Sequence, residues 1–223
     1  MSAYRYYLRG WLNPKERSRW LDLGCGQGHL MRLAKSIGYP WVEGIDASPE
    51  MVAIARKGDL FVRQADVLRA LDSLVEGSFS VISCFDLLEH FPKETGFALL
   101  QKINRALYPG GILLLKLPNA YSPWGMGITA NDLTHEVAYT EATIRQLGRL
   151  AGFQISEVRE IGPVPNSFTG MVRFTLWRSL RLILQGWDMI ETGHPRTRIY
   201  TRVMLCRLEK QQRDDENDRT PDK

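Results

Sequence analysis

An acid and three glycines occupy alternate positions early in the chain, at Asp22, Gly24, Gly26 and Gly28. Glycines spaced in this way let the backbone take left-handed dihedral angles and let a ligand approach the main chain closely. A dinucleotide fingerprint would place its third glycine where His29 stands, and the lysine of a phosphate-binding loop is missing. The stretch therefore predicts a site for another nucleotide-like ligand; an NAD-type site and a purely structural glycine turn are the alternatives.

Two further acids end strand-like segments. Asp46 closes the apolar segment 41–46 about twenty residues after the glycine loop, where an acid of a nucleotide-binding α/β fold accepts hydrogen bonds from ribose hydroxyls. Asp66 follows the segment 60–65 and precedes a helical pattern, so it is suited to cap that helix. Both acids are therefore expected at the sheet edge where open α/β folds bind their ligands.

Alternating strands and helices must position these residues. Residues 20–23 form a short apolar run typical of a buried parallel strand, and a helical pattern begins at about His29. Further strands are predicted at 41–46, 60–65, 79–85, 112–119, 153–161 and 202–208. The predicted caps of intervening helices are Ser48, Asp66 and Thr140. A tight turn is predicted at 108–111. The alternation indicates an α/β fold.

Several segments resemble the motifs of class I S-adenosylmethionine (SAM) methyltransferases in their order and spacing. They are residues 22–28, 44–49, 64–67 and 86–91, together with the Leu-x-Pro-Gly-Gly pattern at 107–111. The resemblance covers roughly residues 18–160. It implies a Rossmann-like three-layer sandwich with a mostly parallel seven-stranded sheet, whose last strand is antiparallel. A helical insertion would lie between strands six and seven, within a single domain spanning residues 1–208.

The same resemblance implies that SAM is the cofactor. Asp46 would hold the ribose, and Asp66 would accept a hydrogen bond from the adenine amino group, with or without capping a helix. The expected SAM-binding residues are Asp22, Gly24, Cys25, Gly26, Gln27, Gly28, Asp46, Ala47, Met51, Asp66, Val67 and Phe85. No metal is expected, since the sequence shows no acidic cluster, although Asp86 and Asp132 are acids near the expected site.

The polar and aromatic segment 119–140 follows the fifth strand, and loops placed in this way on a rigid scaffold carry specificity. Its residues 132–135, followed by 139–141, resemble a segment of methyltransferases from bacterial surface-polysaccharide and lipopolysaccharide clusters, and of some related small-molecule enzymes. Transfer to a hydroxyl requires removal of its proton, and an imidazole suits that role. The candidate catalytic residues are His135, His90 and Asp132, the last of which would orient His135. The alternatives are a hydrogen bond that anchors the loop for His135 and a structural contact for His90.

The sequence thus predicts a SAM-dependent methyltransferase that acts on a sugar hydroxyl of a bacterial glycan or glycolipid. Methylation of a quinone or another small molecule is the alternative, and a SAM-binding protein without transfer activity is a third hypothesis. A nucleic-acid substrate is not expected, because the chain has neither a basic stripe nor an Asn/Asp-Pro-Pro-Tyr/Phe tetrapeptide after the fourth strand.

Two segments lie outside the motifs. Residues 4–13 are predicted to form a short helix that packs against the sheet edge or covers the cofactor. Residues 168–191 are predicted to form a very apolar helix with three arginines. This helix could pack internally, form a homodimer or contact a membrane peripherally, and the last role would suit a lipid-linked acceptor. No segment approaches the ~20 apolar residues of a membrane span.

Composition sets the remaining expectations. The 223 residues carry a net charge of +4 and a hydrophobic share of 44%, which suits one soluble domain. The three cysteines, expected to be buried thiols in a reducing compartment, are Cys25, Cys84 and Cys206. Residues 1–10 lack the apolar core of a signal peptide. A cytoplasmic location, or a peripheral one at the inner membrane face, is expected, with a disordered charged tail at 209–223.

Overall fold

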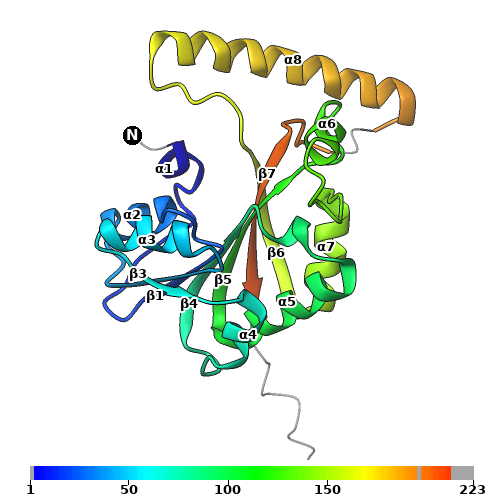
Figure 1. Cartoon of the computed structure of the whole chain (residues 1–223). Coiled ribbons are helices and arrows are strands. Elements are labelled where there is room, and N and C mark those ends of the chain that lie inside the picture. Colours follow the sequence, from blue (N-terminus) through cyan, green and yellow to red (C-terminus); the bar gives the residue numbers. More distant parts are fainter. Residues whose placement is uncertain (1–2, 195–196, 212–223) are drawn as a thin grey trace, which may run out of the picture.

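The computed structural model describes residues 3–194 and 197–211, which form a seven-stranded sheet with helices on both faces (Figure 1). The strand order is β3-β2-β1-β4-β5-β7-β6. The strands are β1 (Arg19–Leu23), β2 (Trp41–Asp46), β3 (Phe61–Gln64), β4 (Phe79–Phe85), β5 (Leu107–Pro118), β6 (Phe153–Glu160) and β7 (Val203–Lys210). Neighbouring strands are parallel, except that β7 runs antiparallel to β5 and β6. The predicted Rossmann-like sheet is therefore confirmed.

Helices form the two outer layers of the sandwich. One face packs against α1 (Ala3–Tyr7), α2 (His29–Ser36) and α3 (Pro49–Lys57), and the other against α4 (Val67–Asp72), α5 (Lys93–Ala106) and α7 (Glu141–Leu150). Short turns of helix at the sheet edge are η1 (Leu88–His90) and α6 (Gly125–Ala130). Successive residues of β5, such as Leu113 and Leu114, enter different core clusters because strand side chains alternate between faces. This double burial explains why the strand is nearly all apolar.

Local sequence signals set several helix starts as predicted. The side chains of Ser48 and Asp66 each accept a hydrogen bond from a backbone N–H three residues further on. Thr140 forms a capping box with Thr143 at the start of α7. The three cysteines are buried free thiols, also as predicted.

The tight turn predicted at 108–111 is wrong, because these residues belong to β5. Leu107 already pairs with Phe79 of β4, and the register between the two strands then shifts. Gly110 takes a φ of 73°, so the chain can bend here without leaving the sheet.

The last strand also runs further than predicted. β7 continues to Lys210, and Glu209 pairs with both Ile112 of β5 and Gln154 of β6. The predicted start of the tail at residue 209 is therefore wrong by at least two residues. The remainder of that tail, residues 212–223, lies outside the described residues.

The N-terminal segment packs against the sheet. Its helix is shorter than the predicted 4–13, but Tyr7, Leu8 and Trp11 are all buried in the core cluster shared with α2. Trp11 Nε1 also donates a 2.6 Å hydrogen bond to Glu157 on β6. The segment therefore joins one helical layer to the far edge of the sheet.

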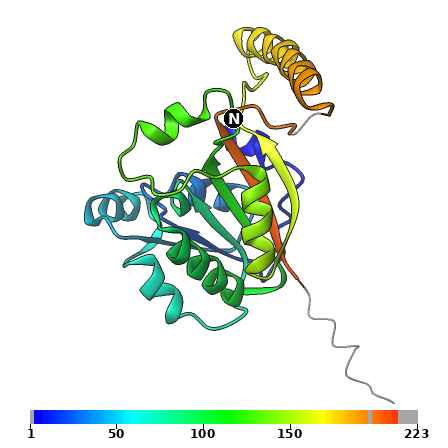
Figure 2. The same ribbon diagram turned by 90° about the vertical axis from the view of Figure 1, so that its right-hand side faces the viewer.

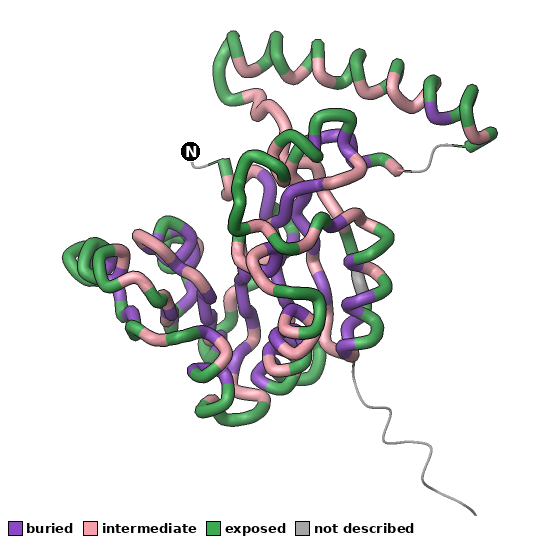
Figure 3. The backbone as a smooth tube through the Cα atoms, turned by 45° about the vertical axis from the view of Figure 1, so that its right-hand side comes forward, coloured by how far each residue is buried: buried purple, intermediate pink, exposed green. Residues whose placement is uncertain are grey.

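Helix α8 (Phe168–Thr192) stands apart from the three layers, in the predicted insertion between β6 and β7 (Figures 1 and 2). It follows the carboxyl end of β6 and crosses that end of the molecule. Its outward side is exposed along its length, whereas the side toward the sheet is partly covered (Figure 3). Among residues 3–194 and 197–211, the structure contains no helix that could serve as a membrane span.

Candidate active site

The loop between β1 and α2 is shaped by its glycines and by an acid of β2. Gly24, Gly26 and Gly28 take left-handed φ values of 65°, 50° and 79°. Asp46 accepts a 2.7 Å hydrogen bond from the backbone N–H of Gly26 and a 2.9 Å bond from that of Ser48. The acid predicted to hold a ribose therefore also fixes the loop. A carboxylate has about four acceptor positions, so Asp46 keeps acceptor capacity for a ligand.

The local geometry of this loop fits a ribose-bearing cofactor. A side chain at Gly28 would be strained by the left-handed φ and would place its Cβ 2.1 Å from Leu60 Cδ1, so glycine is strongly favoured at the start of α2. A Cβ added at Gly26 would have no atom of another part of the protein within 4 Å. The main chain is therefore open to an approaching ligand at Gly26, beside the carboxylate of Asp46.

The predicted SAM-binding residues gather around the carboxyl ends of four neighbouring strands, β3, β2, β1 and β4. Those that are exposed or half-buried are Gly24, Gly26, Gln27, Asp46, Ala47, Met51, Asp66 and Phe85. Those that are buried are Asp22, Cys25, Gly28 and Val67. We therefore expect direct cofactor contacts mainly from the first group and support of the loop from the second.

Asp22 lies beneath the loop. It is buried, and Ser83 of β4 donates a 2.6 Å hydrogen bond to its Oδ1. Trp20 Nε1 in turn donates a 2.8 Å bond to the Ser83 hydroxyl. Burial raises the pKa of Asp22 to about 7, although the Ser83 hydrogen bond acts in the opposite direction. Asp22 thus supports the loop by joining β1 to β4.

An ion pair at the ends of β4 and β5 was missed by the sequence analysis. Lys116 pairs with Asp86, which has a positive φ of 49°. Burial opposes the charge on Lys116, but Asp86 outweighs this effect and the pKa of the lysine is raised. Tyr4 of α1 lies beside the pair, with its ring centroid 5.5 Å from that of Phe85 and 5.9 Å from Lys116 Nζ. The available signal was a single lysine within the apolar run 112–118.

His90 and His135 meet at this edge from two different loops. Their ring centroids are 4.8 Å apart and the ring planes are tilted by 60°. Thr134 donates to Asp132 Oδ1 from both its backbone N–H and its hydroxyl, at 2.9 and 2.6 Å. The proton of the Thr134 hydroxyl is thus engaged by Asp132. His90 Nδ1 lies 2.8 Å from the Thr134 hydroxyl oxygen, so the His90 N–H donates and that oxygen accepts. Asp132 Oδ2 lies 3.8 Å from His135 Nε2, too far for a hydrogen bond.

Glu89 completes the cluster and was not among the predicted catalytic residues. Its side chain is buried, and neither its Oε2 nor Nδ1 of His135 has a hydrogen-bond partner within the described part of the chain. Burial raises the pKa of Glu89 to about 7. The backbone carbonyl oxygen of Glu89 accepts hydrogen bonds from the backbone N–H groups of Glu136 and Val137, at 2.8 and 3.3 Å. These bonds fix the segment 119–140, which we call the acceptor segment because it is expected to bind the methyl acceptor. The available signal was the Glu-His pair within 86–91.

The cluster has the donor types of a metal site as well as those of an acid–base site. One ligand atom from each of Glu89, His90 and His135 lies within 4.8 Å of the others. One carboxylate and two imidazoles suit a divalent transition metal, and the same groups can move a proton without one. The predicted absence of a metal therefore stays a prediction. Leu87 lies between this cluster and the glycine loop. Its two methyl carbons would be 3.4 Å from a Cβ added at Gly24.

Comparison with known sequences identifies relatives of this arrangement. Residues 3–158 match a family model described as a methyltransferase domain. A ubiquinone biosynthesis O-methyltransferase of Xanthomonas oryzae pv. oryzae (strain PXO99A) is 36% identical over 110 residues, which cover 46% of this chain. The match spans 44% of that relative, so less than half of its length is compared.

Solved structures share the fold over nearly the whole chain. A SAM-dependent methyltransferase from Archaeoglobus fulgidus matches with a TM-score of 0.68 at 19% identity, covering 93% of both chains. A second, from Mesorhizobium loti, matches with a TM-score of 0.66 at 20% identity, covering 94% of this chain and 98% of the other. At these identities the likeness shows the fold, and the site residues rest on the geometry described above.

Proposed function

Since the chain belongs to the SAM-dependent methyltransferases, we propose that it methylates a phenolic hydroxyl of a quinone precursor or a related small molecule. The observation that carries this substrate class is the 36% identity to an O-methyltransferase of ubiquinone biosynthesis. It favours the quinone alternative of the sequence analysis over the sugar hydroxyl. The matched segment covers part of each protein, so the acceptor itself is the point to test.

The residues around the glycine loop are proposed to hold the cofactor. SAM supplies an activated methyl group, so the protein chiefly has to position the acceptor and take up its proton. Asp46 would bind the ribose hydroxyls, and Asp66 the adenine amino group. Tyr4 and Phe85 would shield the cofactor from solvent, because their rings pack together beside the carboxyl end of β4.

His135 is proposed to receive the proton of the acceptor hydroxyl. Its Nδ1 has no protein partner within the described residues, and its side chain is largely buried. An ionised Glu89 beside it would stabilise the imidazolium that forms. A phenol, with a pKa of about 10, gives up its proton far more readily than an aliphatic alcohol does. The cluster is therefore better matched to a phenolic acceptor.

The test is a methylation assay with SAM and a panel of acceptors, read by mass spectrometry. The panel contains a catechol with a short prenyl chain, the same catechol without the chain, free sugars and a nucleotide sugar. We expect methylation of the catechols, and methylation of sugars alone would overturn the proposal. A parallel arm contains EDTA, because we expect no metal requirement. Loss of turnover that a divalent cation restores would instead show a metal requirement, with Glu89, His90 and His135 as the candidate ligands.

The sugar hydroxyl remains the second candidate because of one segment. Residues 132–135 and 139–141 resemble the corresponding segment of methyltransferases from surface-polysaccharide clusters. The same panel separates the two candidates, since each predicts a different methylated product.

A further inference from the structure

Helix α8 is bound to the protein by its polar residues. Its half-buried and buried residues recur every three or four positions and face the sheet. Trp177 and Arg181 both contact Glu160 at the end of β6, at 3.3 and 3.2 Å. Asp188 is buried and accepts a 2.6 Å hydrogen bond from Tyr200. These contacts hold one face of the helix in place and leave the opposite face uncovered.

The uncovered face is mainly apolar, and the exposed hydroxyls of Thr169, Thr175 and Ser179 are its polar groups. Its residues, between 44 and 90% exposed, include Phe168, Val172, Leu176, Ile183, Trp187 and Ile190. The whole of α8 lies within the described residues, and no charged side chain falls on this face. A surface helix in water has the reverse pattern, with its apolar stripe toward the core. An exposed and mainly apolar face about 37 Å long indicates a surface that is covered in use.

We propose that this face of α8 lies in the interfacial region of a membrane containing anionic phospholipids. Arg173 and Arg178 are exposed and border the face on its two sides. Of the two acids in the helix, Asp188 faces inward, and Glu191 lies in the last turn on the Arg173 side. An apolar face bordered by arginines is the pattern of a helix that lies flat on such a surface.

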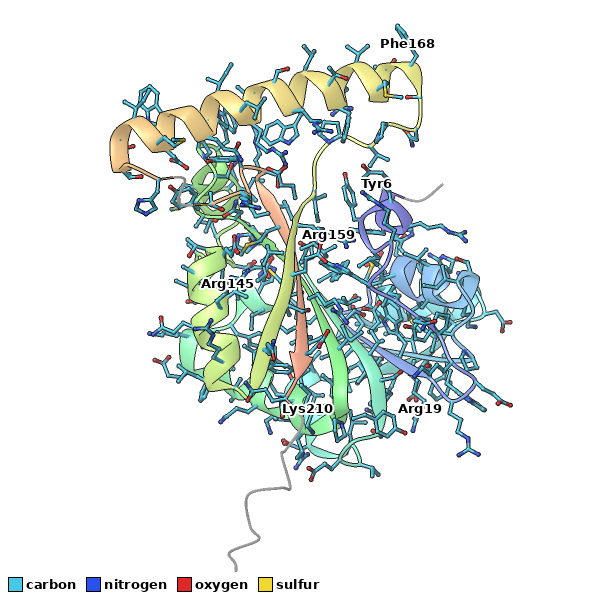
Figure 4. The ribbon with its side chains drawn as sticks, turned by 180° about the vertical axis from the view of Figure 1, so that it is seen from behind. Tyr6, Arg19, Arg145, Arg159, Phe168 and Lys210 are labelled. Carbon is cyan, nitrogen blue, oxygen red and sulfur yellow. The ribbon has the colours of Figure 1, made fainter. Side chains whose placement is uncertain are left out.

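A basic cavity behind the helix adds to this charge pattern. It has a volume of about 440 Å³ and opens between α8, α1 and β6. Five arginines line it, namely Arg9, Arg159, Arg178, Arg181 and Arg198, and Glu160 is the one acid on its described walls. Figure 4 shows Arg159 and Tyr6 on the side of the molecule toward α8, whose first residue is Phe168. Arg159 and Arg181 pair with Glu157 and Glu160, so the positive charge of the cavity comes mainly from Arg9, Arg178 and Arg198. This charge on the same end of the molecule favours an anionic membrane over an uncharged one.

A second copy of the chain fits the same face less well. A symmetric helix pair that crossed near the middle of α8 would bring Arg178 close to its own copy, without an acid on the face to pair with it. A membrane surface instead accepts arginines at its border with water. Docking would also bring the acceptor segment close to lipid, since Tyr121 of that segment contacts Asp188 of α8. The docking itself does not depend on the proposed function.

The test is co-sedimentation of the full chain with vesicles of phosphatidylcholine, with or without phosphatidylglycerol. We expect binding to the anionic vesicles that falls about tenfold or more in the double variant Ile183→Glu/Ile190→Glu, since two charges then face the lipid. Trp41→Glu/Phe61→Glu is the matched control, because it adds the same two charges at side chains that are 63% and 69% exposed at the starts of β2 and β3, away from α8. It should bind like the parent protein. Arg173→Glu/Arg178→Glu should weaken binding to the anionic vesicles only.

Other outcomes would overturn the proposal. Equal binding to both kinds of vesicle would remove the anionic requirement, and binding unaffected by the double variant would remove α8. A dimer that the double variant dissociates, without vesicle binding by the parent protein, would show that a second copy covers the face. Circular dichroism checks that the variants fold. Methylation of a soluble catechol should be unchanged in the double variant, which separates failure of docking from failure of the proposed function.

Discussion

The imidazole rings of His90 and His135 lie 4.8 Å apart, although one follows β4 and the other lies in the loop between α6 and α7. The contact joins the end of a central strand to the segment predicted to bind the acceptor. It also places both rings beside the buried carboxyl group of Glu89. This arrangement leads to the first two predictions.

His135→Ala is expected to lower turnover by roughly 10²- to 10⁴-fold, the usual contribution of a general base. SAM affinity, measured by calorimetry, should change little, because the ring lies outside the glycine loop. His29→Ala, on the exposed start of α2, is the control and should retain activity. Unchanged turnover in His135→Ala would remove this residue as the base.

Glu89→Gln tests the partner of the base through the pH profile. The pKa of Glu89 is raised to about 7, so its carboxyl group is protonated below that pH and ionised above it. If the ionised form supports His135, ionisation of Glu89 adds a rise of kcat with pH through about 7 in the parent enzyme, and the variant loses this contribution while remaining folded. A profile identical in both proteins would assign Glu89 to structure alone.

Asp46→Ala is expected to weaken SAM binding by about 10- to 100-fold, because it removes acceptors of ribose and loop hydrogen bonds. Calorimetry measures the affinity, and circular dichroism checks the fold. Glu43→Ala is the control, because Glu43 lies three residues earlier on the same strand and pairs with Arg19 at the start of β1. An affinity equal to that of the parent protein would contradict the assignment of this loop.

Gly28→Ala is expected to destabilise the protein by roughly 2 kcal/mol or more and to impair SAM binding. It forces a side chain into a left-handed residue and places Cβ 2.1 Å from Leu60 Cδ1. Gly10→Ala separates these two causes, since Gly10 has a similar φ of 74° but no atom within 4 Å of the Cβ position. Denaturant unfolding should show a clearly smaller loss, about 1 kcal/mol, for Gly10→Ala.

Asp22→Asn should change how stability depends on pH. The pKa of Asp22 is raised to about 7 in the folded protein from the usual 3.8 of an aspartate in water, so folding favours the protonated form. This contribution is fully present below pH 3.8 and is lost as the pH rises through 7. The free energy of unfolding of Asp22→Asn, taken relative to that of the parent protein, should therefore rise by on the order of 1–3 kcal/mol from pH 5 to pH 8. Ile82→Val changes no charge and lies in the adjacent strand β4. It should lower the free energy of unfolding by the same amount at pH 5 and at pH 8.

Much of the fold was predictable because its signals are local. The glycine spacing at 22–28 and the caps Ser48, Asp66 and Thr140 each depend on a few neighbouring residues. The irregular start of β5 was not predictable, since the Pro-Gly-Gly sequence suits a turn and only pairing with Phe79 of β4 keeps it in the sheet.

By itself, the sequence determined the α/β alternation, the glycine loop after the first strand and the presence of an apolar helix between the last two strands. Tertiary structure alone decided which side chains meet: Glu89 with the two histidines, Lys116 with Asp86, and the polar side of α8 with Glu160. Hydrophobic periodicity and turn chemistry act over a few residues, so one chain is enough to find them. Contacts between loops depend on how strands far apart in sequence are ordered in the sheet, and contacts with Glu160 and Tyr200 hold α8 with its apolar face outward.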